Sequence, residues 1–257
     1  MTATQQAPAV TPNVTSPPIR KPIRRGRFAL SGFYQSAVGK KWVMAITGLV
    51  LMGFVLAHMI GNLKMYLGAE HLDEYAHWLR AGLLVPVLPE GVALWGMRLV
   101  LILAVGLHIH AAYSLTVLNR RARPQRYASP RDYIAASWAA RTMRWSGVIV
   151  ALFVLFHLAD LTAGWANPDF QEGQVYDNVV ASFERWPVAL FYILANVALG
   201  VHLYHGAWSL FQTMGSMSPR FNPRHNPLRR GIAAAFALAV AGANISFPIA
   251  VLAGVVG

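Results

Sequence analysis

The chain has 257 residues, of which 56% are hydrophobic and only 12% charged, with no cysteine and a formal net charge of +12. Soluble domains carry about 25% charged residues, so this composition, with a mean hydropathy of +0.42, favours a membrane protein over a soluble enzyme. The absence of cysteine excludes disulfides, thiolate-bound iron–sulfur clusters, zinc ribbons and covalently attached c-type haem. Any metal in this chain must therefore be held by His, Met or carboxylate.

The N-terminal segment is rich in Pro, Thr, Ala and Gln and then becomes basic, without the apolar stretch of a signal peptide. We expect residues 1–35 to be a disordered basic cytoplasmic tail and residues 36–257 to be the membrane domain. Five apolar segments in this domain have the roughly 20 residues that a helix needs to cross a bilayer. They cover about 42–66, 92–118, 142–164, 187–213 and 231–256. The sequence thus predicts an all-α membrane protein with five transmembrane helices.

The basic residues are distributed asymmetrically between the two sides of these segments. Of the 22 Lys and Arg residues, 18 fall on the side of the N-terminus. The opposite side holds only Lys64, Arg80, Arg98 and Arg185. The positive-inside rule then predicts a multi-pass protein of the plasma membrane, with a cytoplasmic N-terminus and the C-terminus outside. Since no basic face is interleaved with stacking aromatics, we expect no nucleic-acid partner, and the basic inner loops are candidate docking surfaces for protein partners.

The connection over residues 67–91 is too polar to cross the membrane and contains an amphipathic stretch, EHLDEYAHWLRAGLL. Such a stretch is typical of a short helix lying in the membrane interface. We expect this helix on the outer side.

Six of the nine histidines lie inside the predicted spans, where an ionisable side chain is costly and indicates function. They are His58 in the first span, His108 and His110 in the second, His157 in the third, and His202 and His205 in the fourth. One histidine in each of four helices is the pattern of a four-helix bundle that holds two haems, each between two histidines. The first four spans are therefore expected to form such a bundle.

Depth along the helices sorts these histidines into two levels. His58 and His157 lie toward the outer side, roughly 20 to 24 Å from the inner boundary, and His110 and His202 lie roughly 13 to 17 Å from it. His108 and His110 are two residues apart, about 200° around a helix, so only one of them can face the core. His202 and His205 are three residues apart and share a face, so geometry alone leaves either as a ligand.

At these histidines the chain resembles a known family, the cytochrome b membrane-anchor subunit of succinate dehydrogenase and fumarate reductase, in its single-subunit form with five spans and two b haems. The matching stretches are SAVGKKWVMAITGLVLMGFVLAHMIGNLKMYLG, EYAHWLR, LHIHAAYSL, RTMRWSGVIVALFVLFHLADL and GVHLYHGAWSLFQT. They contain all four histidine-bearing helices in the order of the family.

The resemblance implies two haem b groups, with His58 and His157 as axial ligands of the outer haem and His110 and His202 as those of the inner haem. It implies a complex with a flavoprotein subunit and an iron–sulfur subunit, which carry the FAD and the clusters, and the complex could form a higher oligomer. Electrons would pass from the iron–sulfur subunit through the haems to a quinone, menaquinone in a two-haem enzyme. This chain would then carry haem and quinone sites in the lipid bilayer but no succinate site.

Further polar residues near the span ends are candidates for contacts with haem propionates or quinone. His77, Arg80 and Arg98 lie toward the outer interface, Tyr113 and Arg144 toward the inner one, and His205 lies one turn from His202. A charged side chain at the end of a span is otherwise explained by its reach to the interface.

Two other functions fit the same sequence. One is a di-haem cytochrome b that serves another respiratory dehydrogenase, such as a hydrogenase or formate dehydrogenase. The other is a haem-free transporter whose histidines relay protons or bind a metal, although evident inverted repeats and Gly- or Pro-broken helix pairs are lacking.

Overall fold

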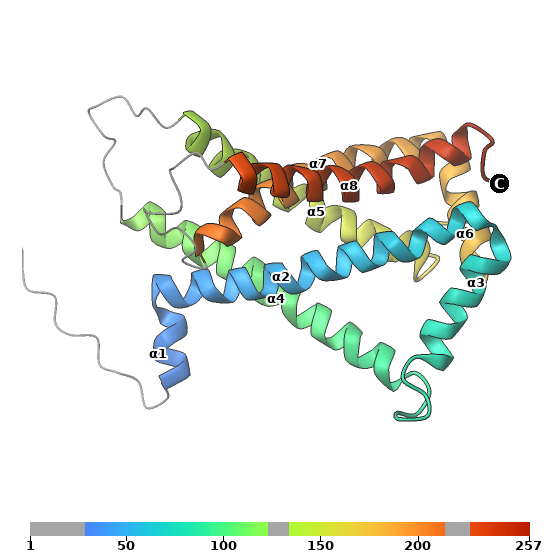
Figure 1. The fold of residues 1–257 in the computed structure, drawn as a ribbon, viewed down its shortest axis with the longest axis horizontal. Coiled ribbons are helices and arrows are strands. Elements are labelled where there is room, and N and C mark those ends of the chain that lie inside the picture. Colours follow the sequence, from blue (N-terminus) through green and yellow to red (C-terminus); the bar gives the residue numbers. More distant parts are fainter. Residues whose placement is uncertain (1–28, 123–133, 214–226) are drawn as a thin grey trace, which may run out of the picture.

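A computed structural model of the chain describes residues 29–122, 134–213 and 227–257 (Figure 1). Every regular element in these three ranges is a helix. The prediction of an all-α protein is therefore confirmed for the part of the chain that the structure describes. The greater part of the basic N-terminal segment and of the two basic connections lies outside these ranges, and so does the docking surface expected there.

Five helices are long and apolar enough to cross a membrane. They are α2 (Ala37–Asn62), α4 (Val92–Arg121), α5 (Ile134–Leu161), α7 (Trp186–Thr213) and α8 (Pro227–Leu252). They coincide with the five predicted spans, although α2 and α8 begin and end a few residues earlier than expected, and α5 begins eight residues and ends three residues earlier. Their number and composition indicate a multi-pass membrane protein.

The long helices form two hairpins with one added helix. α2 packs on α4, α5 packs on α7, and α8 lies along α7 (Figure 1). Small residues permit the close approach of α7 and α8, since a Cβ added at Gly200 would lie 3.0 Å from the Cβ of Ala241. α2 also contacts α7, so the two hairpins face each other and the four histidine-bearing helices surround a common interior.

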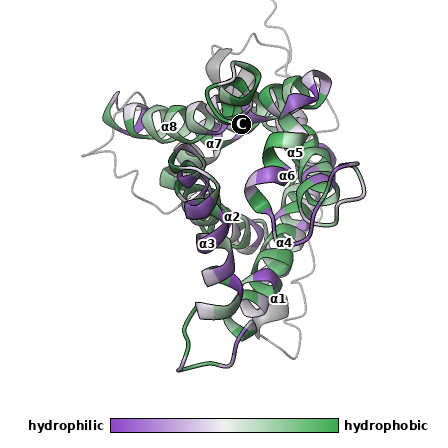
Figure 2. Ribbon diagram, turned by 90° about the vertical axis from the view of Figure 1, so that its right-hand side faces the viewer, coloured by the Kyte–Doolittle hydropathy of each residue, from purple (hydrophilic) through white to green (hydrophobic). Residues whose placement is uncertain are grey.

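Short helices cap one end of this assembly, where α2 ends and α7 begins (Figure 1). They are η1 (Leu63–Leu67), α3 (Ala69–His77), the π-helical turn η2 (Trp78–Gly82) and α6 (Val175–Glu184). Hydrophilic residues gather on α3 and on part of α6 (Figure 2). The short helix predicted within residues 67–91 is thus present, whereas α6 is an element that the hydropathy pattern does not predict.

At the opposite end, the chain forms a short helix α1 (Ala29–Gln35) before α2. The expectation that the disordered tail extends to residue 35 is therefore wrong for residues 29–35. Ser36 separates the two helices because its hydroxyl accepts a hydrogen bond from the Gly39 backbone N at 2.9 Å and caps α2. Lys40 Nζ donates to the Tyr34 carbonyl at 3.0 Å and ties α1 to the first turn of α2.

Candidate functional site

Two pairs of histidines face each other across the interior between the hairpins. His58 on α2 lies against His157 on α5, with ring centroids 5.9 Å apart and ring planes at 87°. His108 on α4 lies against His202 on α7, with centroids 6.4 Å apart and planes at 66°. Each of the four helices therefore contributes one ring, and α2 is paired with α5 and α4 with α7, as the depths of the histidines predicted.

The structure does not bring His110 to His202, so this expectation from the resemblance is wrong. His110 points away from the interior toward α1, where its Nδ1 lies 2.6 Å from the Tyr34 hydroxyl and its ring stacks on the tyrosine at 5.8 Å. The two candidates differ by about 200° around α4, and the packing of α4 on α2 turns His108 inward. His108 is the partner of His202.

A hydroxyl group lies beside the Nδ1 atom of each ring in the His108–His202 pair. Thr47 Oγ1 is 3.2 Å from His108 Nδ1, and Ser146 Oγ is 3.4 Å from His202 Nδ1. Each hydroxyl donates its single proton to a carbonyl of the preceding turn of its own helix, at 2.7 and 3.2 Å. Toward the imidazole it can only accept, so Nδ1 carries the proton and Nε2 keeps a free lone pair.

A glycine follows each of these hydroxyl residues and lies against the same ring. A Cβ added at Gly48 would lie 3.3 Å from His108 Cε1, and one added at Gly147 would lie 3.4 Å from His202 Cε1. A larger side chain at either position would push against the imidazole. The glycines therefore let α2 and α5 approach the histidine of the neighbouring helix.

α2 and α5 share a short sequence repeat that contains the hydroxyl residue, the glycine and the histidine. The stretches TGLVLMGFVLAH (47–58) and SGVIVALFVLFH (146–157) share a hydroxyl residue, a glycine, and a phenylalanine four residues before the histidine. Phe54 stacks on His58 at 5.5 Å, and Phe153 lies beside His157 at 5.7 Å. In each helix the hydroxyl residue lies at the level of the His108–His202 pair, and the histidine eleven residues later lies at the level of the His58–His157 pair. At the helical rise, the two levels are about 16 Å apart. Each hairpin thus supplies one histidine to each level.

At the level nearer α3 and α6, His157 adjoins a buried polar network. The Tyr192 hydroxyl lies 3.4 Å from His157 Nδ1 and donates to Asp160 Oδ2 at 2.9 Å. Arg185 Nη2 forms an ion pair with Asp160 Oδ1 at 2.7 Å, and Ser182 donates a short hydrogen bond to the same carboxylate. Asp160 is 0% exposed, so its charge is compensated entirely by these partners.

The separations of the rings fit a metal held between them. Two metal–imidazole bonds of about 2 Å on opposite sides of one ion place the ring centroids about 6 Å apart. The observed values are 5.9 and 6.4 Å. In the part of the chain that the structure describes, no group of three or more His, Cys, Asp or Glu could hold a metal. Pairs of histidines, each supplying only two ligands, suit an iron whose other four ligands come from a macrocycle.

The polar residues expected near the outer side of the membrane lie around the capping helices. His77 is the last residue of α3, and Arg80 follows in η2, both exposed. Arg98 is half-buried near the start of α4, and its guanidinium lies 4.8 Å from the ring of Trp95. These three residues therefore belong to the same end of the bundle as the His58–His157 pair.

The remaining candidates lie nearer the other end. Tyr113 is 69% exposed on α4, and Arg144 is exposed on α5. His205 is buried on α7, with its ring 5.1 Å from that of Tyr204. It shares a face with His202 but is not the ring that faces His108.

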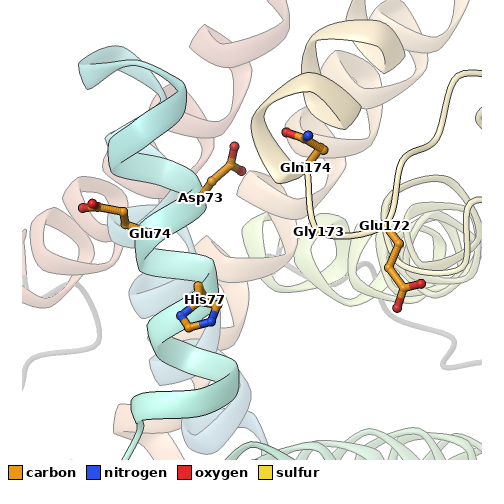
Figure 3. A pocket seen from close by; sticks show the side chains of 6 residues that line it. All are labelled: Asp73, Glu74, His77, Glu172, Gly173 and Gln174. Atoms are coloured by element: carbon orange, nitrogen blue, oxygen red, sulfur yellow. The ribbon is translucent and has the colours of Figure 1, made fainter.

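A pocket of about 500 Å³ opens beside His77 between α3 and the segment that precedes α6 (Figure 3). It is lined by Asp73, Glu74, His77, Glu172, Gly173 and Gln174. Three carboxylates make this lining acidic, whereas pockets for apolar ligands are lined mostly by hydrophobic side chains. The pocket therefore does not support His77 as part of a quinone site.

The polar partners of the histidines were not anticipated from the sequence. Thr47 and Ser146 could have been found from the repeat shared by the two stretches that contain them. Asp160 could have been found as a carboxylate inside an apolar span, where an acidic residue is rare and marks function. Tyr192 and Ser182 have no comparable signal, because only the packing of α6 and α7 on α5 brings them to Asp160.

Comparison with known families gives one match. The model for a family described as "Succinate dehydrogenase/Fumarate reductase transmembrane subunit" matches residues 118–243, just under half of the chain. The matched region holds His157 and His202, one histidine of each pair, together with the polar network. Comparisons with curated proteins and with solved structures gave no match.

Proposed function

We propose that the chain belongs to this family and is the membrane-anchor cytochrome b subunit of a succinate:quinone oxidoreductase. Its two haem b groups are bound between His58 and His157 and between His108 and His202. The observation that carries the proposal is the pair of facing imidazoles at each of two levels, with ring separations suited to one iron apiece. The family match over residues 118–243 supplies the kind of complex.

The chain's own residues orient three of the four imidazoles, those of His108, His202 and His157. Thr47, Ser146 and Tyr192 each accept from an Nδ1–H, which leaves Nε2 as the nitrogen that can bind the metal. Gly48 and Gly147 leave room for the rings of the neighbouring helices. Haem bound in this way supplies one-electron transfer, and two histidines per iron leave no open position for a small ligand.

The proposed complex includes a flavoprotein subunit with FAD and an iron–sulfur subunit on the cytoplasmic side. In this proposal, which the charge asymmetry of the loops supports, the cytoplasmic side is the end where α1 lies. The His108–His202 pair is then the inner level and the His58–His157 pair the outer one. The C-terminus then lies outside. His108 and His202 would hold the haem nearer the iron–sulfur subunit, and the haems would supply electron transfer to a quinone of the bilayer, menaquinone in this proposal.

Polar residues near the ends of the spans are proposed to contact the haem propionates or the quinone. Arg98 and Arg80 are proposed for the outer end, where the acidic pocket beside His77 argues against a quinone contact by that residue. Tyr113, Arg144 and His205 are proposed for the inner end. Arg98 is the strongest of the outer candidates because it is half-buried and lies at the same depth as Tyr192. Arg98 lies ten residues before His108 on α4, and Tyr192 lies ten residues before His202 on α7.

The test is a reduced-minus-oxidised visible spectrum of the complex purified through a tag on this chain, with haem quantified as pyridine haemochrome. We expect two b haems per chain and co-purification of a flavoprotein and an iron–sulfur protein with succinate-dependent haem reduction. A preparation without haem would overturn the proposal. If the chain contained two haems but co-purified with a hydrogenase or a formate dehydrogenase, the haem sites would be supported and the proposed complex would be rejected.

A further inference from the structure

The hydroxyl groups beside the histidine Nδ1 atoms donate their hydrogen bonds to different kinds of acceptor at the two histidine levels. At the His108–His202 level, Thr47 and Ser146 donate to neutral backbone carbonyls of their own helices. At the His58–His157 level, Tyr192 donates to the carboxylate of Asp160. An ionised acceptor makes the stronger hydrogen bond.

The direction of the hydrogen bonds that link His157, Tyr192 and Asp160 follows from the single proton of the Tyr192 hydroxyl. The Tyr192 hydroxyl has one proton, and the 2.9 Å contact with Asp160 Oδ2 uses it. Toward His157 Nδ1, at 3.4 Å, the phenol oxygen can therefore only accept. The order is His157 Nδ1–H to Tyr192 oxygen, and Tyr192 O–H to the Asp160 carboxylate.

Asp160 is held in place as a fixed acceptor. Arg185 binds its Oδ1 at 2.7 Å and also donates to the Ala166 carbonyl at 2.7 Å, which anchors the guanidinium. Ser182, which is 0% exposed, donates to Oδ2 and accepts from Arg185 at 2.9 Å. Elements α5, α6 and α7 thus meet at one carboxylate, and its oxygens cannot turn away from Tyr192.

The repeat shows that this arrangement is built at only one of the two outer histidines. Asp160 lies three residues after His157, and the equivalent position after His58 is Gly61. A Cβ at Gly61 would lie 2.6 Å from Tyr75 Cε1, so the ring of Tyr75 fills the space. The carboxylate is therefore a property of the second hairpin and not of the repeat.

From these contacts we infer that Tyr192, backed by Asp160, is a positioning residue that fixes the His157 imidazole and increases its electron density, so that the outer haem is harder to reduce. The inference rests on the proposed function. Hydrogen-bond partners of metal-bound histidines raise ligand basicity and set ring orientation, and an electron-rich ligand favours the oxidised metal.

The test is a redox titration of the two haems in the purified complex carrying Tyr192→Phe. Phe keeps the ring that packs on Phe153, Phe156 and Phe183 but removes the acceptor at Nδ1. We expect the reduction equilibrium of the outer haem to shift about tenfold toward the reduced form, a rise of about 59 mV for a one-electron couple. The inner haem should keep its potential.

Ser146→Ala is the matched control, because it removes the hydroxyl at His202 of the inner level. It should shift the inner haem and leave the outer one unchanged. A His157→Ala variant should retain only the inner haem and would thereby identify the inner step of the titration.

Asp160→Asn supplies an independent arm, because the amide oxygen still accepts from Tyr192 but without the charge. It should raise the outer potential in the same direction. The inference would be overturned if the outer haem kept its potential in both variants, or if both haems shifted equally. The proposed function would still stand in that case, provided that the wild-type complex contains two haems. Absence of haem from the wild-type complex would reject the proposed function itself.

Discussion

His108 on α4 faces His202 on α7 with ring centroids 6.4 Å apart, while His110, two residues further on, contacts Tyr34 on α1. This relationship makes His108 the proposed ligand of the inner haem. We expect His108→Ala to reduce the haem content from two to one per chain. His110→Ala should retain both haems, because its ring lies outside the interior. Haem quantified per chain in each variant checks the prediction, and retention of two haems in His108→Ala would contradict it.

The approach of Gly48 to His108 gives a second prediction. Even a Cβ at Gly48 would lie 3.3 Å from the ring, and the two methyl groups of valine would force the imidazole out of line with His202. Gly48→Val should therefore lose the inner haem and keep the outer one. The control is Gly53→Val on the same helix, because nothing lies within 4 Å of a Cβ there. The redox titration of each variant separates the two haems, and normal inner haem in Gly48→Val would count against the close approach.

Much of the architecture follows from the sequence because hydropathy and length alone determine which segments can cross a membrane. The pairing of His58 with His157 follows as well, since depth is proportional to residue number along a straight helix. The choice between His108 and His110 could not be made in this way. Their spacing shows only that they point in opposite directions, and the contact of α4 with α2 decides which one faces inward.

The polar network depends in the same way on packing between elements distant in the sequence. Asp160 lies on α5, Ser182 on α6, Arg185 at the junction that follows, and Tyr192 on α7. α6 is too short and too polar to be recognised as an apolar span. Its hydrophobic side chains pack against the core of the bundle, where Phe183 is buried. The sequence does not predict α1, because Ala29–Gln35 is too short to show a helical pattern and directly follows the basic tail.

The buried ion pair between Asp160 and Arg185 gives a prediction about stability. Arg185→Ala would leave a carboxylate that is 0% exposed without its cation. Loss of one partner of a buried pair costs about 3 to 5 kcal/mol, and we expect the lower end because the Arg185 side chain is 28% exposed. Chemical unfolding in detergent micelles measures this loss.

Lys64→Ala is the matched control for that measurement. The Lys64 ammonium lies 5.6 Å from the centroid of the Tyr75 ring, and such a contact contributes about 0.5 to 1 kcal/mol. The double variant Asp160→Asn with Arg185→Ala should recover part of the stability lost in Arg185→Ala, because no buried charge remains. A double variant no more stable than Arg185→Ala would show that Asp160 does not carry the cost.

Asp73 on α3 connects the two polar capping helices, since its Oδ1 accepts a hydrogen bond from the Tyr176 backbone N in the first turn of α6 at 3.0 Å. This carboxylate takes the role of an N-terminal cap supplied from another helix. Asp73→Ala should destabilise the start of α6 by about 1 kcal/mol, which corresponds to about fivefold faster hydrogen exchange at the Tyr176 amide. Glu74→Ala, which removes an exposed carboxylate from the same pocket, should leave that exchange rate unchanged. Equal acceleration in both variants would show that pocket charge, and not the cap, sets the exchange rate at Tyr176.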